Sequence, residues 1–155
     1  LCEPERACDA LQQGGKELII RPGLGALDGV MANLSEQTRA EAAAAGIEIG
    51  QIPARLRAFA FQNVAHSFFF DDAPAAVLAV RVIGEGGDTF LIAADGFFEQ
   101  SVKHRRALRE HLNGLIEWFG TIHTVTRSNH PNMPRWLKML GYEPHPSFEN
   151  LYRWG

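Results

Sequence analysis

The sequence predicts a single α+β domain in which helices cover both faces of a mixed, mostly antiparallel sheet. Two observations lead to this class. Short apolar runs of strand length are separated by turn residues, and longer stretches with a helical period stand before and after them. The predicted order is β-α-α-β-β-β-α-β-α-β. A chain of 155 residues with 46% hydrophobic residues is large enough to bury one substantial core.

The first strand and the helices that follow it occupy the first 64 residues. Residues 16–21 read as a strand because Pro22 and Gly23 end the run. Apolar residues then recur at helical spacing over residues 24–34. A second helical piece covers residues 35–45, and a further helix is predicted from Ala54 to about Val64.

An antiparallel meander is predicted next. Residues 66–71 and 75–83 read as strands joined by a turn at residues 72–74. Residues 84–87 are glycine-rich, which is typical of a hairpin turn, and residues 89–94 form the third strand of the meander.

The last part of the chain alternates between helices and strands. Residues 102–119 form the strongest helix, and one apolar stripe runs along it: Leu108, Leu112, Leu115, Ile116 and Phe119. Residues 121–126 alternate like a strand, residues 133–140 form a short helix that ends at Gly141, and residues 148–154 form a last strand.

Composition excludes several classes of protein. Residues 1–15 are expected to be an N-terminal extension without the apolar core of a signal peptide, and residues 16–155 form the single domain. The net charge of −3 argues against nucleic acid as a partner, and no apolar run is long enough to predict a membrane helix. Cys2 and Cys8 show no spacing for a metal, and none is expected.

Two local stretches resemble the GNAT family of N-acetyltransferases. Residues 100–108 stand where that family has Q/R-x-x-G-x-G/A before a helix, and Gln100 and Leu108 keep the family spacing. Residues 129–142 resemble the family's Asn-led segment, which ends in a short helix and Gly-Tyr. Residues 41–47 and 136–141 also look like small GNAT-like proteins of tailed phages, including internal core proteins of short-tailed phages.

The resemblance implies an acetyl-CoA site between two strands that splay apart, here residues 89–94 and 121–126. The pyrophosphate would lie at the start of the next helix, where free N–H groups attract an anion. Lys103 and Arg105 stand at the family's glycine positions, so the pyrophosphate loop is degenerate. The predicted cofactor-binding residues are Gln100, Lys103, His104, Arg105, Arg106 and Asn129. A solvated basic helix face is the alternative for the cationic residues.

A second glycine motif is interpreted as structural. Residues 81–86 read R-x-x-G-x-G, but a strand rather than a helix follows them. The glycines therefore predict a hairpin, and no phosphate site is expected there.

Proton transfer is the least defined part of the predicted site. The family's tyrosine acid corresponds by spacing to Leu137, which carries no transferable proton. Tyr142 is the candidate acid in its place, with a ring packed at the end of the helix as the alternative. Asp95 and Glu99 follow the central strand and are the candidate general bases.

Two functions remain open from the sequence. One is an acetyl-CoA-dependent N-acyltransferase with an amine acceptor. The other is a non-catalytic GNAT-like structural or assembly protein of a phage or prophage, with phage structural proteins as partners. A cytoplasmic location is expected, or the virion in the second case. The altered glycines and Leu137 favour the second function, and fold analogy favours the first.

Overall fold

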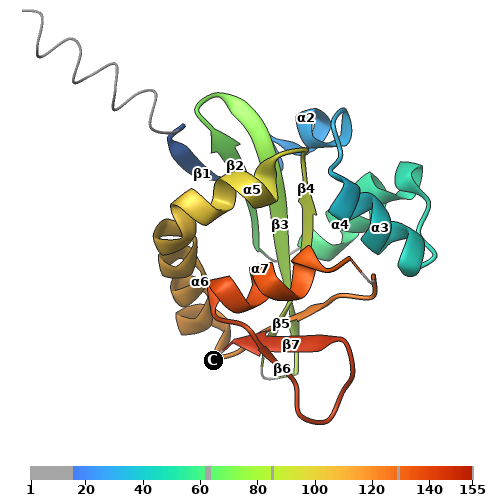
Figure 1. Ribbon diagram of the computed structural model, residues 1–155, viewed down its shortest axis with the longest axis vertical. Helices are drawn as coiled ribbons and strands as arrows, with labels where there is room; N and C mark the ends of the chain where they lie inside the picture. The colour runs from blue at the N-terminus through green and yellow to red at the C-terminus, as the bar shows by residue number, and fades with distance from the viewer. Residues whose placement is uncertain (1–15, 62–63, 85, 129, 155) are drawn as a thin grey trace, which may run out of the picture.

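The computed structural model describes residues 16–61, 64–84, 86–128 and 130–154. One mixed sheet crosses the molecule in the order β1-β2-β3-β4-β5-β7-β6. Figure 1 shows α5, α6 and α7 on one face of this sheet, with α2, α3 and α4 beside the other. The α+β class with helices on both faces is confirmed.

Seven strands form the sheet: β1 (Leu18–Pro22), β2 (Val64–Phe70), β3 (Ala73–Ile83), β4 (Gly86–Ala93), β5 (Ile122–Val125), β6 (Glu143–Pro144) and β7 (Leu151–Trp154). The helical elements are α2 (Leu27–Met31), α3 (Glu36–Ala44), the 3₁₀ turn η1 (Ile49–Gln51), α4 (Ile52–Ala60), α5 (Phe97–Ser101), the 3₁₀ turn η2 (Val102–His104), α6 (Arg105–Phe119) and α7 (Asn132–Leu140).

Strand β3 is buried on both faces, and its alternate residues build two separate cores. Leu78 and Val80 pack with α6 and α7, whereas Val77 and Ala79 pack with α2, α3 and α4. The predicted meander of β2, β3 and β4 is confirmed. Its first turn is tighter than predicted, because Asp71 adopts a positive φ of 54° and β3 already begins at Ala73.

The glycine-rich segment forms the predicted hairpin. Ile83 pairs with Gly86 across the turn, and Gly84 has a φ of 57°. β4 therefore begins at Gly86, three residues before the predicted strand. Close packing accounts for Gly87, since a Cβ there would lie 2.9 Å from the Val80 side chain. The structural interpretation of this motif is confirmed.

All three helical stretches predicted before β2 form helices, so the predicted order, which counted two, was short by one. The chain is extended at Leu34, which bridges to Ala94 and separates α2 from α3. The Ser35 hydroxyl caps α3 by accepting a hydrogen bond of 3.1 Å from the Thr38 N–H. The predicted helix from Ala54 was wrong at both ends: α4 begins at Ile52 and ends at Ala60.

The long helix after β4 was also predicted with the wrong start. Gly96 adopts a left-handed conformation with a φ of 82°, which lets the chain turn into α5 directly after the strand. His104, the last residue of η2, has non-helical dihedral angles, so α6 begins as a separate helix at Arg105. The apolar stripe is confirmed in α6, where Leu108, Leu112 and Leu115 are buried, and Ile116 and Phe119 are partly buried.

At the other end of the sheet, β5 runs parallel to β4 and antiparallel to β7. Gly141 ends α7 with a φ of 110°, and a Cβ there would lie 2.7 Å from the Trp154 ring. The sequence did not predict the two-residue strand β6. β7 begins at Leu151 rather than at residue 148, after Asn150 turns with a φ of 64°.

Candidate functional site

Strands β4 and β5 splay apart in the middle of the sheet. Among the described residues, their ladder comprises only the pairs Gly87–Ile122 and Asp88–His123. Past this point the Thr89 hydroxyl still donates to the His123 carbonyl at 2.7 Å. The remaining length of β4 then has an edge that β5 does not cover. The predicted splay is confirmed.

Part of this open edge is covered by α3. The Ala93 N–H donates to the Thr38 hydroxyl at 3.0 Å, and the Ala93 carbonyl accepts from the Ser35 N–H at 2.9 Å. Backbone groups of alternate strand residues point the same way, so the N–H and carbonyl of Leu91 also face the gap. Leu91 therefore offers a short stretch of backbone to an extended ligand between the strands.

The gap opens into a pocket of about 480 Å³. The splayed strands contribute Thr89–Ile92 and Thr124–Val125, and the residues just past β5 complete that side. Helices α3 and α4 form the opposite wall, and α7 contributes Met133, Trp136 and Leu137. We call this space the strand-gap pocket. It is reached from both helical layers, because its lining comes from helices on both faces of the sheet.

A carboxylate clasp holds one end of the strand-gap pocket together. Glu41 on α3 accepts hydrogen bonds from the Thr126 hydroxyl, from the Arg127 N–H at 2.8 Å and from the Ser128 hydroxyl at 2.9 Å. The Ser128 N–H adds a longer bond of 3.4 Å. These contacts fix α3 to the segment that follows β5.

A cation lies against the aromatic wall at the other end. The Arg81 guanidinium stacks over the Phe59 ring with 4.4 Å to its centroid and contacts the Asp88 carboxylate at 3.3 Å. Phe90 lies beside Phe59, with 5.6 Å between ring centroids. Arg55 from α4 and Arg127 also line the pocket.

A second hollow of about 270 Å³ lies between α5 and α7. It shares Gln37, Phe98 and Trp136 with the strand-gap pocket, so these side chains stand between the two spaces. Phe98 and Trp136 pack edge to face, with 5.0 Å between their ring centroids. The Trp136 indole N–H donates a hydrogen bond of 2.6 Å to the buried Ser101 hydroxyl. We call this shared wall of the two spaces the Trp136 constriction.

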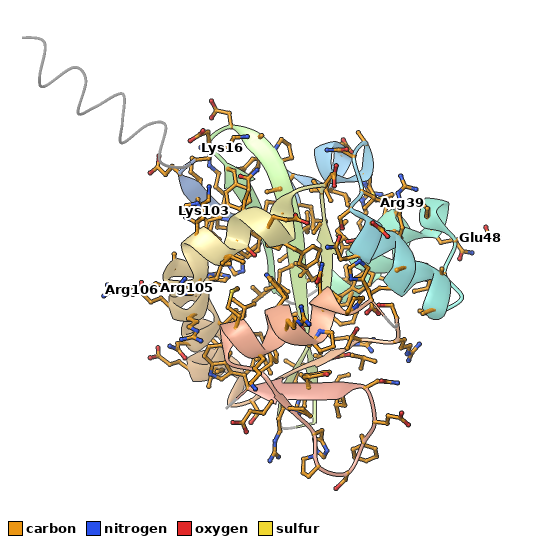
Figure 2. The ribbon with its side chains drawn as sticks, viewed as in Figure 1. Lys16, Arg39, Glu48, Lys103, Arg105 and Arg106 are labelled. Carbon is orange, nitrogen blue, oxygen red and sulfur yellow. The ribbon has the colours of Figure 1, made fainter. Side chains whose placement is uncertain are left out.

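The predicted cofactor residues lie beside this region rather than in the strand-gap pocket. Gln100 is inside α5, where its N–H donates to the Gly96 carbonyl, and not ahead of a helix as predicted. Lys103, Arg105 and Arg106 are exposed around the start of α6 (Figure 2), on the opposite side of the molecule from Arg39.

His104 and Asn129 complete the predicted cofactor residues. His104 is half-buried and packs against the Phe70 ring, with 5.3 Å between ring centroids. Arg106 makes an exposed contact with Glu110. Asn129 lies outside the described residues.

The predicted catalytic residues are dispersed. Asp95 is exposed after β4, and its N–H donates to the Asn33 carbonyl. Glu99 lines the hollow between α5 and α7. Tyr142 is buried beside a small cavity of about 40 Å³, which has room for only a few waters. Burial raises the pKa of the Tyr142 hydroxyl well above its ordinary value, and a side-chain hydrogen bond with Thr89 partly opposes that rise.

Leu137 stands where the resemblance placed a tyrosine acid. Its side chain is buried and lines both the strand-gap pocket and the small cavity beside Tyr142. The position therefore reaches the gap, but it contributes an apolar surface there.

Sequence reasoning missed the charged residues of the pocket lining, namely Glu41, Arg55, Arg81, Asp88 and Arg127. Their contacts join segments up to 87 residues apart, and no local motif marks them. Gly96 carried a usable signal, because a glycine directly after a strand is typical of a tight turn into a helix. Among the described residues, no group of three His, Cys, Asp or Glu side chains is placed to hold a metal ion.

Comparison with known proteins finds similarity in structure but not in sequence. No protein-family model matches the chain, and no curated protein matches its sequence. The GNAT domain of S. lividans PAT matches the structure with a TM-score of 0.63 at 13% identity, over 86% of each chain.

Two named acetyltransferases also match the structure. The ribosomal-protein-S5-alanine acetyltransferase from Vibrio fischeri has a TM-score of 0.55 at 12% identity, over 88% of this chain and 92% of that one. The ribosomal-protein-S18-alanine N-acetyltransferase from Escherichia coli has a TM-score of 0.54 at 13% identity, over 88% and 91%. At these identities the matches establish the fold alone. In the described part of the chain, no helix has the length and apolar character needed to cross a membrane.

Proposed function

Given a GNAT acetyltransferase fold, we propose that this protein transfers an acyl group from acetyl-CoA to an amine. One observation carries the proposal: the splay between β4 and β5 opens into a pocket of about 480 Å³. A thioester lying in the gap and an amine lying in the pocket would meet at the splayed strands. Holding two reactants in this way can contribute roughly 7–11 kcal/mol to the lowering of a barrier.

The residues of the gap suit a pantetheine arm. The backbone of Leu91 faces the gap, and an extended amide chain can pair with it as a strand would. The apolar side chain of Leu137 gives such an arm a surface to pack against. The hollow beyond the Trp136 constriction would hold the outer part of the cofactor, with Asn132 and Arg135 of α7 in its lining.

The phosphates would lie beyond that hollow. Val102 lines it, and Lys103 and Arg105 follow on the exposed surface around the start of α6. Side chains would therefore hold the phosphates, because the glycines that cradle a pyrophosphate in the family are replaced here.

Acetyl-CoA would supply the thioester: the amine nitrogen bonds to the carbonyl carbon, the C–S bond breaks, and the thiol leaves with the proton that the amine loses. Leu137 cannot donate that proton. Tyr142, which lines the small cavity that Leu137 also lines, remains the candidate acid, and Glu99 in the lining of the cofactor hollow remains the candidate base.

A non-catalytic GNAT-like module, such as a phage assembly protein, is the second candidate. Two observations favour it: the apolar Leu137 at the position of the acid, and the packed Phe98–Trp136 pair in the wall that the pocket shares with the hollow. Under this alternative the gap is a remnant that no longer binds acetyl-CoA.

Calorimetric titration with acetyl-CoA and measurement of thiol release with amines test the proposal. Thr124→Trp should fill the gap and abolish binding, since Thr124 lines it from β5. Thr121→Trp is the matched control just outside that lining and should bind normally. Absence of binding by the wild-type protein at millimolar acetyl-CoA would favour the non-catalytic module.

A further inference from the structure

The strand-gap pocket has an uneven charge. Its lining includes three arginines, Arg55, Arg81 and Arg127, and two carboxylates, Glu41 and Asp88. The chain as a whole has a formal net charge of −3, so the positive excess of this pocket is local. Local excess charge in a concave, partly apolar site favours a ligand of the opposite sign.

Both carboxylates are already engaged with the protein. Glu41 accepts four hydrogen bonds from the segment after β5. Asp88 contacts Arg81 at 3.3 Å, and this pair neutralises one cation of the pocket. Neither carboxylate forms an ion pair with Arg55 or Arg127, and three arginines against two carboxylates leave the lining with a formal charge of +1.

Arg55 and Arg127 remain as exposed cations without an ion-pair partner among the described residues. They approach the pocket from different segments, Arg55 from α4 and Arg127 from the end of β5. The backbone of Arg127 is held by Glu41, so the base of this side chain has a fixed position. Two guanidinium groups that reach one pocket are suited to a carboxylate or a phosphate.

We propose that the acceptor amine of this pocket carries an anionic group, a carboxylate or a phosphate, which Arg55 and Arg127 hold. The inference rests on the proposed acyl transfer and names the class of acceptor. Phe59 and Phe90 line the same pocket, so it offers an apolar surface to the body of the acceptor. The acceptor class is therefore an amino acid or amino phosphate with an aliphatic body.

Matched amines test the charge preference. Initial rates of thiol release from acetyl-CoA are measured with hexylamine, 6-aminohexanoate and 6-aminohexyl phosphate. Two exposed charge contacts should raise kcat/KM for the anionic amines by about tenfold over hexylamine, and each contact by roughly threefold. Comparison of kcat/KM for 6-aminohexanoate with kcat/KM for 6-aminohexyl phosphate shows whether the pocket prefers a carboxylate or a phosphate.

Variants identify the residues. The Arg55→Gln/Arg127→Gln double variant should lose the preference for anionic amines, so that the ratio of kcat/KM for 6-aminohexanoate to kcat/KM for hexylamine falls to about one. Arg57→Gln is the matched control, because Arg57 lies on the same helix, is exposed, and is not part of the pocket lining. Equal kcat/KM values for the three amines in the wild-type protein, or an unchanged preference in the double variant, would overturn the inference and leave acyl transfer intact.

Failure of the acyl-transfer proposal would give a different result. If acetyl-CoA does not bind, calorimetric titration of the protein with 6-aminohexanoate and with hexylamine still compares the ligands. Tighter binding of 6-aminohexanoate that Arg55→Gln/Arg127→Gln removes would support an anion-selective pocket. Equal binding of the two ligands, or no binding of either, would refute it.

Discussion

The Glu41 carboxylate accepts a hydrogen bond of 2.8 Å from the backbone N–H of Arg127 and so joins α3 to the segment after β5. The two residues are 86 positions apart and come from opposite sides of the strand-gap pocket. The hydroxyl groups of Thr126 and Ser128 donate further hydrogen bonds to the same carboxylate. This clasp holds the splayed strand in place where its ladder with β4 has already ended.

Removal of the clasp should weaken the domain. Glu41→Ala leaves the Arg127 N–H and the hydroxyl groups without their acceptor, and hydrogen bonds to a charged group contribute about 1.5–3 kcal/mol each in favourable cases. Because Glu41 is partly exposed, we expect a total loss of about 1–3 kcal/mol in the free energy of unfolding, measured by urea denaturation. Glu117→Ala on the exposed side of α6 is the control and should change stability by less than about 0.5 kcal/mol.

Two histidines give the protein a pH-dependent stability. The rings of His66 on β2 and His111 on α6 pack edge to face, with 4.7 Å between their centroids. Each ring has a buried nitrogen without a hydrogen-bond partner among the described residues. Burial and the neighbouring His66 lower the pKa of His111 to about 4, and burial also lowers the pKa of His66. In the folded state both rings are therefore neutral near pH 7.

The sign of the effect follows from proton uptake. The unfolded chain protonates these histidines near pH 6.5, whereas the folded chain resists protonation down to about pH 4 for His111. The contribution of the two neutral histidines to stability should therefore be fully present above pH 6.5, and it should be lost as the pH decreases. With allowance for partial exposure, we expect His111 to account for about 1 kcal/mol lost between pH 7 and pH 5.

Denaturation series at pH 7, 6 and 5 measure this loss. His111→Gln should reduce the slope, and His145→Gln should keep it, because His145 lies outside the buried pair. A wild-type slope that persists unchanged in His111→Gln would show that other groups cause the pH dependence.

The sequence predicted elements well where a local pattern decides the structure. The stripe through Leu108, Leu112 and Leu115 required a helix against the sheet, and Gly84 required a turn. The start of α5 was missed because Phe97 and Phe98 were not recognised as helical, although Gly96 turns the chain directly into them. Their aromatic contacts with Trp136 are tertiary and leave no periodic pattern.

The site was harder to predict than the fold for the same reason. The gap between β4 and β5 follows from strand order, so the resemblance could locate it. The charged residues of the strand-gap pocket come from α3, α4, β3, β4 and the segment after β5, and their proximity depends on the whole fold. Glu41 stands in an alanine-rich helix that resembles many others, and its partners appear only when the chain is folded.

The Trp136 constriction provides a test of the core between α5 and α7. Trp136→Phe removes the indole N–H that donates to the Ser101 hydroxyl at 2.6 Å. Ser101 is fully buried but still donates to the Phe98 carbonyl, so we expect a loss of about 1–2 kcal/mol in the free energy of unfolding. Trp118→Phe is the matched control, because that side chain is 84% exposed and should change stability little. Equal effects of the two substitutions would mean that the Ser101 contact contributes nothing measurable.

The basic residues around the start of α6 are the proposed site for the cofactor phosphates. Lys103 and Arg105 are exposed and follow Val102, which lines the hollow between α5 and α7. If they bind the phosphates of CoA, the Lys103→Ala/Arg105→Ala double variant should weaken acetyl-CoA binding by about tenfold in calorimetric titration. The wild-type affinity should also fall as salt is added, because exposed charges are screened beyond about 8–10 Å at physiological ionic strength.

Arg57→Ala on α4 serves as the control for loss of a surface cation and should leave acetyl-CoA affinity unchanged. Stability provides a second measurement. Cations near a helix start interact unfavourably with the helix dipole, and each lowers the stability by roughly 0.3–1 kcal/mol unless an anion is bound there. If no phosphate binds, the double variant should instead be slightly more stable than the wild-type protein in urea denaturation. Unchanged acetyl-CoA affinity together with increased stability would therefore contradict phosphate binding by this cluster and identify it as a solvated face of the helix.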